Sequence, residues 1–219
     1  MANRWNSPDK FNREALQWDE NPQRRALAQS VATAIIEATT PQKTMQALEF
    51  GCGTGLVTFE IAPLVKALSA VDTSIAMLAV LRDKINTYGI TNIEANCIDL
   101  LSPSESDFHE KSFDLIYSSM TLHHIADTAG FLNRISTLLS PGGILALADL
   151  DLEDGLFHDD PLEKVHHGFD REALAEMLKT AGLQPLAFET IYTFNKKNRS
   201  GATVVYPVFL LTATKTIVS

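Results

Sequence analysis

Cysteine is scarce in this sequence, and long apolar runs are absent from it. The two cysteines, Cys52 and Cys97, do not stand at the spacing of a metal site, and a single pair cannot build a disulfide-rich scaffold. The N-terminal segment lacks the apolar core of a signal peptide, and no apolar run approaches the roughly 18 residues of a membrane-spanning helix. We therefore expect a cytoplasmic protein without a membrane span.

Basic residues are also few. Lysine and arginine number 18 against 27 aspartate and glutamate residues, which gives a formal net charge of -9. Because a negative surface repels phosphate groups, nucleic acid is not expected as a partner. Lys196, Lys197 and Arg199 form one late basic cluster, which we interpret as the solvated tip of a hairpin. The length of 219 residues, without internal repeats, fits one domain.

The sequence does contain a regular alternation of two hydrophobic periods. Apolar residues at helical spacing predict a first helix that begins near Arg24 and ends before Pro41, and further helical stripes follow Ser74 and Asp127 or Thr128, which can cap them. Short apolar runs, typical of buried strands, lie at 45–50, 67–71, 93–98, 113–117 and 144–150. Strands that alternate with helices predict a doubly wound α/β sheet with parallel strands.

The C-terminal part departs from this alternation. The Pro141-Gly142-Gly143 turn is expected to end the helix before the fifth strand, and Asp170 can cap a last helix that Gly182 ends. Two β-rich segments follow at 186–194 and 202–214, and the polar residues 195–201 between them cannot supply a helix. We predict an antiparallel pair of strands at one edge of the sheet.

The strongest functional signal is the segment Leu48-Glu49-Phe50-Gly51-Cys52-Gly53-Thr54-Gly55, where a buried strand runs into three alternate glycines. Glycine adopts the positive φ of a tight turn and lets a ligand approach the backbone. The helix expected from Leu56 then presents free amide groups to an anionic group such as a carboxylate. Because many glycine-rich turns are only turns, the motif needs support from its surroundings.

Two acidic residues at neighbouring strand ends supply this support. Asp72 ends the second expected strand, where a carboxylate can accept hydrogen bonds from the ribose hydroxyls of a nucleoside. Asp99 follows the third strand and can bind the exocyclic amine of adenine. Because ligands bind at the carboxyl ends of parallel strands, the sequence predicts one adenosine site at three strand ends.

Together these motifs resemble a class I S-adenosylmethionine-dependent methyltransferase over about residues 45–214. The run Ser118-Ser119-Met120-Thr121-Leu122-His123-His124 is similar to the small-molecule, ubiquinone-biosynthesis-like branch of that family. The resemblance implies a Rossmann-like, doubly wound seven-stranded sheet of order 3-2-1-4-5-7-6 with strand 7 antiparallel. It also implies S-adenosylmethionine as cofactor and S-adenosylhomocysteine as product. Residues 1–40 are expected to form an N-terminal helical lid or arm, and 41–219 the methyltransferase domain.

The resemblance also implies which residues hold the cofactor. In the family, the glycine turn packs against the methionine moiety, and the residues matching Asp72 and Asp99 hold ribose and adenine. The full set expected to bind the cofactor is Trp18, Glu49, Gly51, Cys52, Gly53, Gly55, Asp72, Thr73, Asp99, Leu100 and Ser118. The aromatic residues Trp5, Phe11 and Trp18 form either a lid that excludes water or an ordinary packed arm.

Methyl transfer from a sulfonium is an in-line displacement, and a small-molecule acceptor is expected. Alignment of the reactants can lower the activation barrier by about 7–11 kcal/mol. Some acceptors also need a base to remove a proton from the nucleophilic atom. His123, just past the fourth strand, is the first candidate for this base. The further candidates are His124, Asp149, Asp151, His158, His166 and His167. The segment from His158 to His167 matches no metal motif, so no metal is predicted, and we expect the segment to line the acceptor pocket.

Three other functions compete with this interpretation. A dinucleotide-dependent oxidoreductase carries G-x-G-x-x-G, but Leu56 stands where its third glycine would be. A nucleic-acid amino-methyltransferase would carry Asn/Asp-Pro-Pro-aromatic in place of Ser118-Ser119-Met120-Thr121. A non-catalytic S-adenosylmethionine-binding module would keep the fold without the chemistry. The residues indicate neither the acceptor and its methylated atom nor the oligomeric state.

Overall fold

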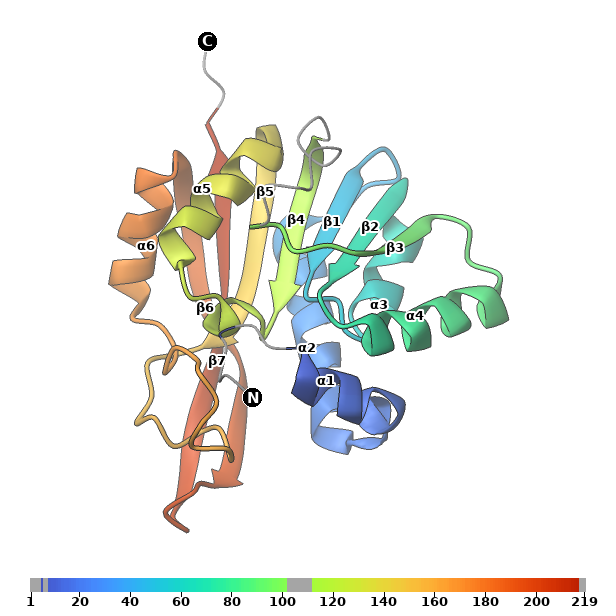
Figure 1. Ribbon diagram of the computed structural model, residues 1–219. Coiled ribbons are helices and arrows are strands. Elements are labelled where there is room, and N and C mark those ends of the chain that lie inside the picture. Colours follow the sequence, from blue (N-terminus) through green and yellow to red (C-terminus); the bar gives the residue numbers. More distant parts are fainter. Residues whose placement is uncertain (1–4, 6–7, 102–111, 217–219) are drawn as a thin grey trace.

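A computed structural model describes residues 5, 8–101 and 112–216, and its centre is one seven-stranded sheet of order β3-β2-β1-β4-β5-β7-β6 (Figure 1). Strand β7 runs antiparallel to both of its neighbours, β5 and β6, and the other pairs are parallel. The predicted sheet order and the antiparallel seventh strand are therefore confirmed. The strands are β1 Gln46–Phe50, β2 Ala67–Asp72, β3 Ile93–Cys97, β4 Phe113–Ser119, β5 Leu139–Leu150, β6 Leu183–Lys197 and β7 Thr203–Lys215.

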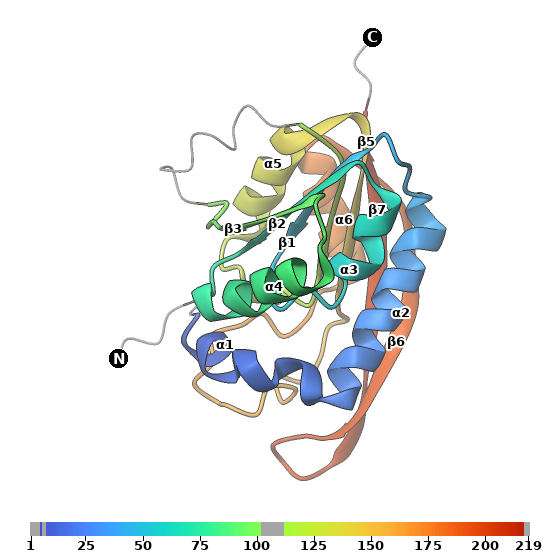
Figure 2. The ribbon, with the colours of Figure 1, turned by 90° about the vertical axis from the view of Figure 1, so that its right-hand side faces the viewer.

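Helices cover both faces of the sheet, with α2 and α5 on opposite sides (Figure 2). The α-helices are α1 Asp9–Glu14, α2 Pro22–Thr39, α3 Thr58–Ile61, α4 Ile75–Tyr88, α5 Thr128–Leu138 and α6 Arg171–Thr180. Short 3-10 turns are η1 Ala15–Glu20, η2 Ala62–Leu64 and η4 Leu122–His124. Because side chains alternate along a strand, Ala47 packs into the core under α2, α3 and α4, while Leu48 packs into the core under α5 and α6.

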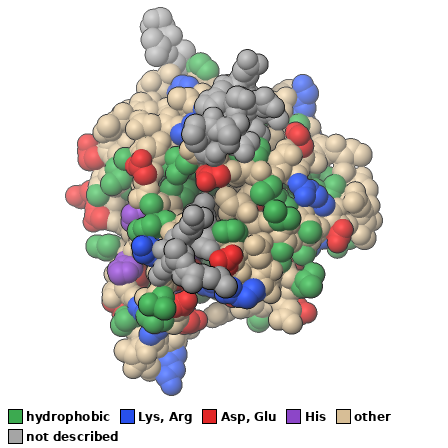
Figure 3. Space-filling model, in the orientation of Figure 1, with side chains coloured by type: hydrophobic (Ala, Val, Ile, Leu, Met, Phe, Trp, Pro, Cys, Tyr) green, Lys and Arg blue, Asp and Glu red, His purple; other side chains and the backbone are tan. Residues whose placement is uncertain are grey.

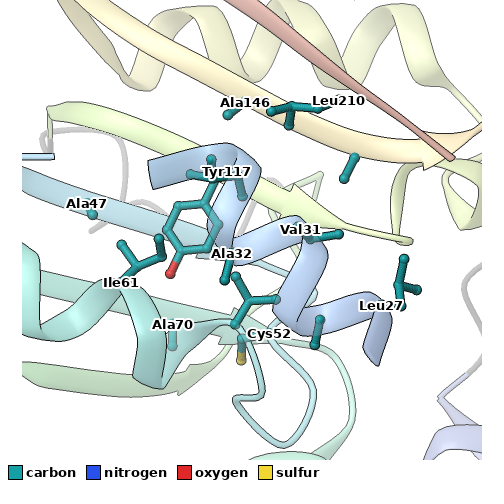
Figure 4. Packing of buried hydrophobic residues seen from close by; sticks show 14 of the residues in the cluster. Leu27, Val31, Ala32, Ala47, Cys52, Ile61, Ala70, Tyr117, Ala146 and Leu210 are labelled. Carbon is teal, nitrogen blue, oxygen red and sulfur yellow. The ribbon is translucent and has the colours of Figure 1, made fainter. Parts of the chain in front are cut away.

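Helix α2 is part of the domain core. Asn21 caps it by accepting hydrogen bonds from the amides of Gln23 and Arg24, and the first helical residue is proline, which needs no such bond. Val31, Ala32 and Ile35 on its apolar face are fully buried. Val31 and Ala32 lie over the sheet on the side of Tyr117 (Figure 4). Among the described residues of the predicted arm, the helices α1 and η1 lie outside this core.

The C-terminal hairpin is longer than predicted. Strand β6 begins at Leu183, and pairing continues to Lys197 opposite Thr203, so only residues 198–202 form the loop. Residues 195–197 are polar, and the sequence therefore predicted a loop there. They belong to a strand nevertheless, because a two-stranded ribbon that faces solvent needs no hydrophobic pattern. Strand β5 likewise begins at Leu139, so Pro141-Gly142-Gly143 lies inside the strand and the helix ends before it.

The extended end of the hairpin holds the loop that follows β5. Lys196 Nζ donates to the carbonyl of Phe157 at 2.6 Å, and the Tyr206 hydroxyl donates to Asp154 at 3.0 Å. Figure 1 shows this loop, the hairpin tip and α1 at the same end of the sheet, where β1 and β4 finish. Within the described residues, the helices are all too short or too polar to cross a bilayer.

Candidate active site

A cavity of about 530 Å³ opens at this end of the sheet. It is bounded by the turns after β1, β2 and β3, by the N-terminal arm and by the loop after β5. The sequence-predicted residues that line it are Phe11, Trp18, Glu49, Gly51, Cys52, Gly53, Asp72, Thr73, Asp99, Leu100, His123, His124 and His158. Gly55 and Ser118 do not line it: the Ser118 hydroxyl is turned to the Phe50 carbonyl at 2.8 Å and supports the end of β1.

The three alternate glycines all have positive φ, but they have different neighbours. A Cβ on Gly51 would lie 2.1 Å from Thr121 Oγ1, and one on Gly55 would lie 2.5 Å from Leu81 Cδ1. A Cβ on Gly53 would meet nothing within 4 Å. Gly51 and Gly55 are therefore required for packing within the protein, whereas Gly53 leaves open space in the cavity wall.

Asp72 joins the end of β2 to the glycine turn. Its Oδ2 accepts a hydrogen bond from the Gly53 amide and its Oδ1 one from the Ser74 amide, both at 2.8 Å. Burial raises the pKa of this carboxyl, and the backbone amides oppose that rise. Asp99, which is exposed, lines the same cavity after β3. The predicted convergence of Gly53, Asp72 and Asp99 on one cavity is thus what the structure shows.

Glu49 is a buried acid at the end of β1. The hydroxyls of Thr58 and Tyr117 donate to its Oε2 at 2.5 and 3.1 Å. Burial raises the pKa of the Glu49 carboxyl from 4.5 to about 8, although these two hydrogen bonds act in the opposite direction. The group is therefore protonated at neutral pH in the protein without ligand.

This protonation makes stability pH-dependent in a defined direction. The folded state keeps the proton at pH values where the unfolded state has already released it, so stability should fall as pH rises from about 4.5 to about 8. We expect the melting temperature to fall over this range, and to fall less steeply in Glu49→Gln, which remains uncharged. If the melting temperatures of the two proteins change by the same amount between pH 5 and pH 8, Glu49 is not protonated in the folded protein.

His123 forms a buried pair with Asp149. Its Nδ1 lies 2.7 Å from Asp149 Oδ1, and its backbone amide donates to Oδ2 at 3.2 Å. The amide of Leu150 also donates to Oδ1 at 2.7 Å. Because Asp149 accepts these bonds, the imidazole proton is assigned to Nδ1, which leaves the lone pair on Nε2. His123 lines the cavity, so this nitrogen is suited to accept a proton there.

Two further histidines, His124 and His158, surround His123, with ring centroids 4.2 and 5.1 Å from its own. Both line the cavity, and burial lowers the pKa of each imidazole. His166 instead contacts Thr128 and the Ile125 carbonyl, and His167 does not line the cavity. Over the described part of the chain, no three histidine, cysteine or acidic residues are placed to hold a metal ion.

The N-terminal arm crosses the cavity and contacts both of its sides. On the side of the glycine turn, Asp19 accepts a hydrogen bond from Thr54 at 2.5 Å, and Asn12 accepts one from Ser74 at 2.7 Å. On the other side, Lys10 forms an ion pair with Glu163 at 2.9 Å. Sequence reasoning missed Glu163 and Lys10, because a single charge in a polar segment gives no signal of its distant partner.

A doubly wound sheet of this order is shared with solved structures of S-adenosylmethionine-dependent methyltransferases. Residues 48–145 match a family model described as a methyltransferase domain. Residues 48–145 are therefore similar to a methyltransferase domain, in agreement with the predicted methyltransferase class and with S-adenosylmethionine as the predicted cofactor.

Individual relatives agree with this class. An uncharacterised methyltransferase of Schizosaccharomyces pombe is 33% identical over 152 residues, which are 64% of this chain and 53% of that protein. A malonyl-[acyl-carrier protein] O-methyltransferase of Bacillus cereus is 27% identical over 175 residues, which are 78% and 60% of the two chains. The chain thus spans between half and two thirds of the length of these two curated relatives.

A solved structure shows the same fold. The 1,6-didemethyltoxoflavin-N1-methyltransferase of Burkholderia thailandensis, with bound 1,6-didemethyltoxoflavin and S-adenosylhomocysteine, superposes with a TM-score of 0.73 at 19% identity. The superposition covers 96% of this chain and 87% of that one. The architecture is therefore shared over almost all of this chain, well beyond the part that the family model matches.

Proposed function

We propose that this chain transfers the methyl group of S-adenosylmethionine to a small molecule. The observation that carries the proposal is the meeting of Gly53, Asp72 and Asp99 with His123 in one cavity. Its volume of about 530 Å³ is within the range of small-molecule sites. The fold neighbour with bound 1,6-didemethyltoxoflavin and S-adenosylhomocysteine supports a small acceptor of this kind.

The cofactor half of the cavity fits S-adenosylmethionine. Open space beside Gly53 allows the ligand to approach the backbone, Asp72 would hold the ribose, and Asp99 would hold the adenine. Glu49 would face the cationic amino group, which favours its ionised form. When bound, S-adenosylmethionine supplies a methyl group on a positively charged sulfur. Arm residue Trp18, stacked against Arg24 at 3.6 Å, would help to exclude water as part of a lid.

In the acceptor half, the residues of the chain position the acceptor and move one proton. His123 Nε2 would take the proton of the acceptor's nucleophilic atom as that atom gains the methyl group, which leaves the cofactor product as a neutral thioether. Asp149 stabilises the imidazolium that forms. A non-catalytic binding module would bind S-adenosylhomocysteine equally well but would transfer no label from methyl-labelled donor to any small molecule.

A nucleic-acid acceptor is not part of this proposal. The formal net charge is -9, and on the face seen in Figure 3 basic and acidic side chains are interspersed rather than gathered into one basic field. Of the basic residues that line the cavity, Lys10, Arg24 and Lys196 are paired with carboxylates. Transfer of label to an oligonucleotide would contradict this part of the proposal.

Replacement of Asp72 by alanine tests the cofactor site. We expect S-adenosylhomocysteine to bind the variant more weakly by about 2 kcal/mol, because a charge-assisted hydrogen bond to ribose is lost. Isothermal titration calorimetry measures this, with NADH as the ligand that the wild-type protein should not bind. Asp83→Ala is the matched control, since it removes an exposed carboxylate of α4 outside the cavity.

Asp72→Asn separates two contributions of this side chain. The amide keeps one oxygen for a backbone amide of the glycine turn or of Ser74, so a loss of affinity in this variant reports the missing charge rather than a disturbed turn. Unchanged affinity in both Asp72 variants, or tighter binding of NADH than of S-adenosylhomocysteine, would contradict the assignment.

A further inference from the structure

A second imidazole–carboxylate pair faces the cavity beside the pair of His123 and Asp149. His158 Nδ1 lies 3.4 Å from Glu163 Oε2, and both side chains are mostly buried, with exposed fractions of 12% and 14%. Lys10 of the N-terminal arm donates to the same Glu163 oxygen at 2.9 Å. The ring centroids of His158 and His123 are 5.1 Å apart, so the two pairs stand next to each other on one wall.

The charges of this second pair determine where the imidazole proton lies. His158 and Lys10 hold the pKa of the Glu163 carboxyl down to about 2 in spite of its burial, so Glu163 is a carboxylate at neutral pH. Burial lowers the pKa of His158, so its imidazole is neutral. The single ring proton then lies on Nδ1, which faces the carboxylate, and Nε2 carries a lone pair.

The Nε2 atom of His158 has no hydrogen-bond partner among the residues that the structure describes. It is buried, and it accepts no hydrogen bond from any residue that the structure describes. Buried polar atoms are almost always hydrogen-bonded, and one that is not needs an explanation. Because His158 lines the cavity that the methyl acceptor would occupy, a bound molecule is the natural source of the missing donor.

We propose that His158 is an acceptor-binding residue, which accepts a hydrogen bond from a second hydroxyl or N–H group of the methyl acceptor. Glu163 is the positioning residue that fixes the ring proton of His158 on Nδ1. This inference rests on the proposed function, because it takes the cavity to be a methyl-acceptor site. The acceptor then carries two hydrogen-bond donors, one for His123 and one for His158.

The surroundings limit the acceptor further. Phe11 and Phe157 line the cavity next to the histidines, which suits an apolar or aromatic body. A carboxylate at His158 is disfavoured, because it would face a lone pair with the Glu163 carboxylate directly behind the ring. Lys10 does not offset this, since Glu163 already engages it. The acceptor class is therefore an uncharged molecule, or a cationic amine, with two polar hydrogens.

Nitrogen-15 NMR of the histidine rings tests the inference directly. In the full-length protein at neutral pH we expect His158 to be neutral with its proton on Nδ1. In Glu163→Gln we expect a mixture of both ring tautomers. Proton on Nε2, or an imidazolium, in the wild-type protein would overturn the proposal, as would an unchanged tautomer in Glu163→Gln. This measurement needs no ligand, so its outcome is distinct from failure of S-adenosylhomocysteine to bind.

Three probes that share one phenyl ring then test the chemistry of the subsite in protein saturated with S-adenosylhomocysteine. Phenol carries a donor, anisole has none, and benzoate is an anion. We expect phenol alone to shift the His158 Nε2 resonance. In His158→Leu, which has no acceptor, the dissociation constant of phenol, measured from the shift of the His123 ring resonances, should rise about tenfold, as for one lost hydrogen bond.

The control is His167→Leu, which changes an exposed histidine outside the cavity and should leave phenol binding as it is. The proposal is overturned if benzoate or anisole acts as strongly as phenol, if phenol has no effect up to its solubility limit, or if His158→Leu binds phenol as the wild type does. If the wild type fails to bind S-adenosylhomocysteine at all, the proposed function fails instead.

Discussion

Replacing His123 by glutamine is expected to slow methyl transfer by about 10²–10⁴-fold, the usual contribution of a positioned general base. The buried Asp149 contacts both the ring Nδ1 and the backbone amide of His123, so the direction of the ring Nε2 is defined. Glutamine has a similar size but no basic nitrogen. Turnover of labelled S-adenosylmethionine with the acceptor found in a small-molecule screen measures the effect.

The binding of S-adenosylhomocysteine separates loss of the base from loss of the fold. We expect His123→Gln to bind it within about twofold of the wild type, since an interaction made only in the transition state leaves ground-state binding unchanged. His167→Gln, on the exposed part of the same loop that carries His158, should keep full activity. If His123→Gln retains wild-type turnover, positioning alone drives the reaction and no base is used.

Gly53→Ala is expected to abolish binding of S-adenosylhomocysteine while the protein stays folded. The added methyl group meets no protein atom within 4 Å, so it occupies the open space that the ligand needs. The backbone of Gly53 has a positive φ of 53°, which lowers the free energy of unfolding by about 1–2 kcal/mol when the residue carries a Cβ. Calorimetry gives the binding, and a thermal melt gives the stability of the same sample.

Two other glycines make this result interpretable. Gly89, at the end of α4, has a φ of 64° and equally open surroundings, but it lies outside the cavity, so Gly89→Ala has the same backbone cost and should bind normally. Gly51→Ala should lose stability by about 1–3 kcal/mol more, because its Cβ collides with Thr121. Normal binding in Gly53→Ala would show that the turn does not form the cofactor site.

The contrast among these glycines shows where sequence reasoning reaches its limit. Gly51, Gly53 and Gly55 look equivalent in the motif, and all three were predicted to bind the cofactor. The structure places Gly55 against Leu81 and outside the cavity. What distinguishes them is the neighbour brought close by the fold, and Leu81 and Thr121 carry no mark in the sequence that they will be those neighbours.

The ends of the strands were predictable for a physical reason. Alternating periods of apolar residues determine which segments are strands, and parallel strands bring their carboxyl ends to one edge. Asp72 and Asp99 therefore had to lie near the glycine turn once the strands were recognised. The polar ends of β6 and β7 were not predictable in this way, because a hairpin outside the core needs no hydrophobic pattern.

The sequence by itself determined the class of fold, the cofactor class and the strand ends that place Gly53, Asp72 and Asp99 at one cavity, because these follow from local periodicity and local turn chemistry. The tertiary structure alone decided the contacts around His123: Lys10 reaches Glu163 across 153 residues, and Glu163 in turn faces His158 beside His123. Contacts between an arm and a loop depend on where the core places them. No pattern in either segment specifies its partner.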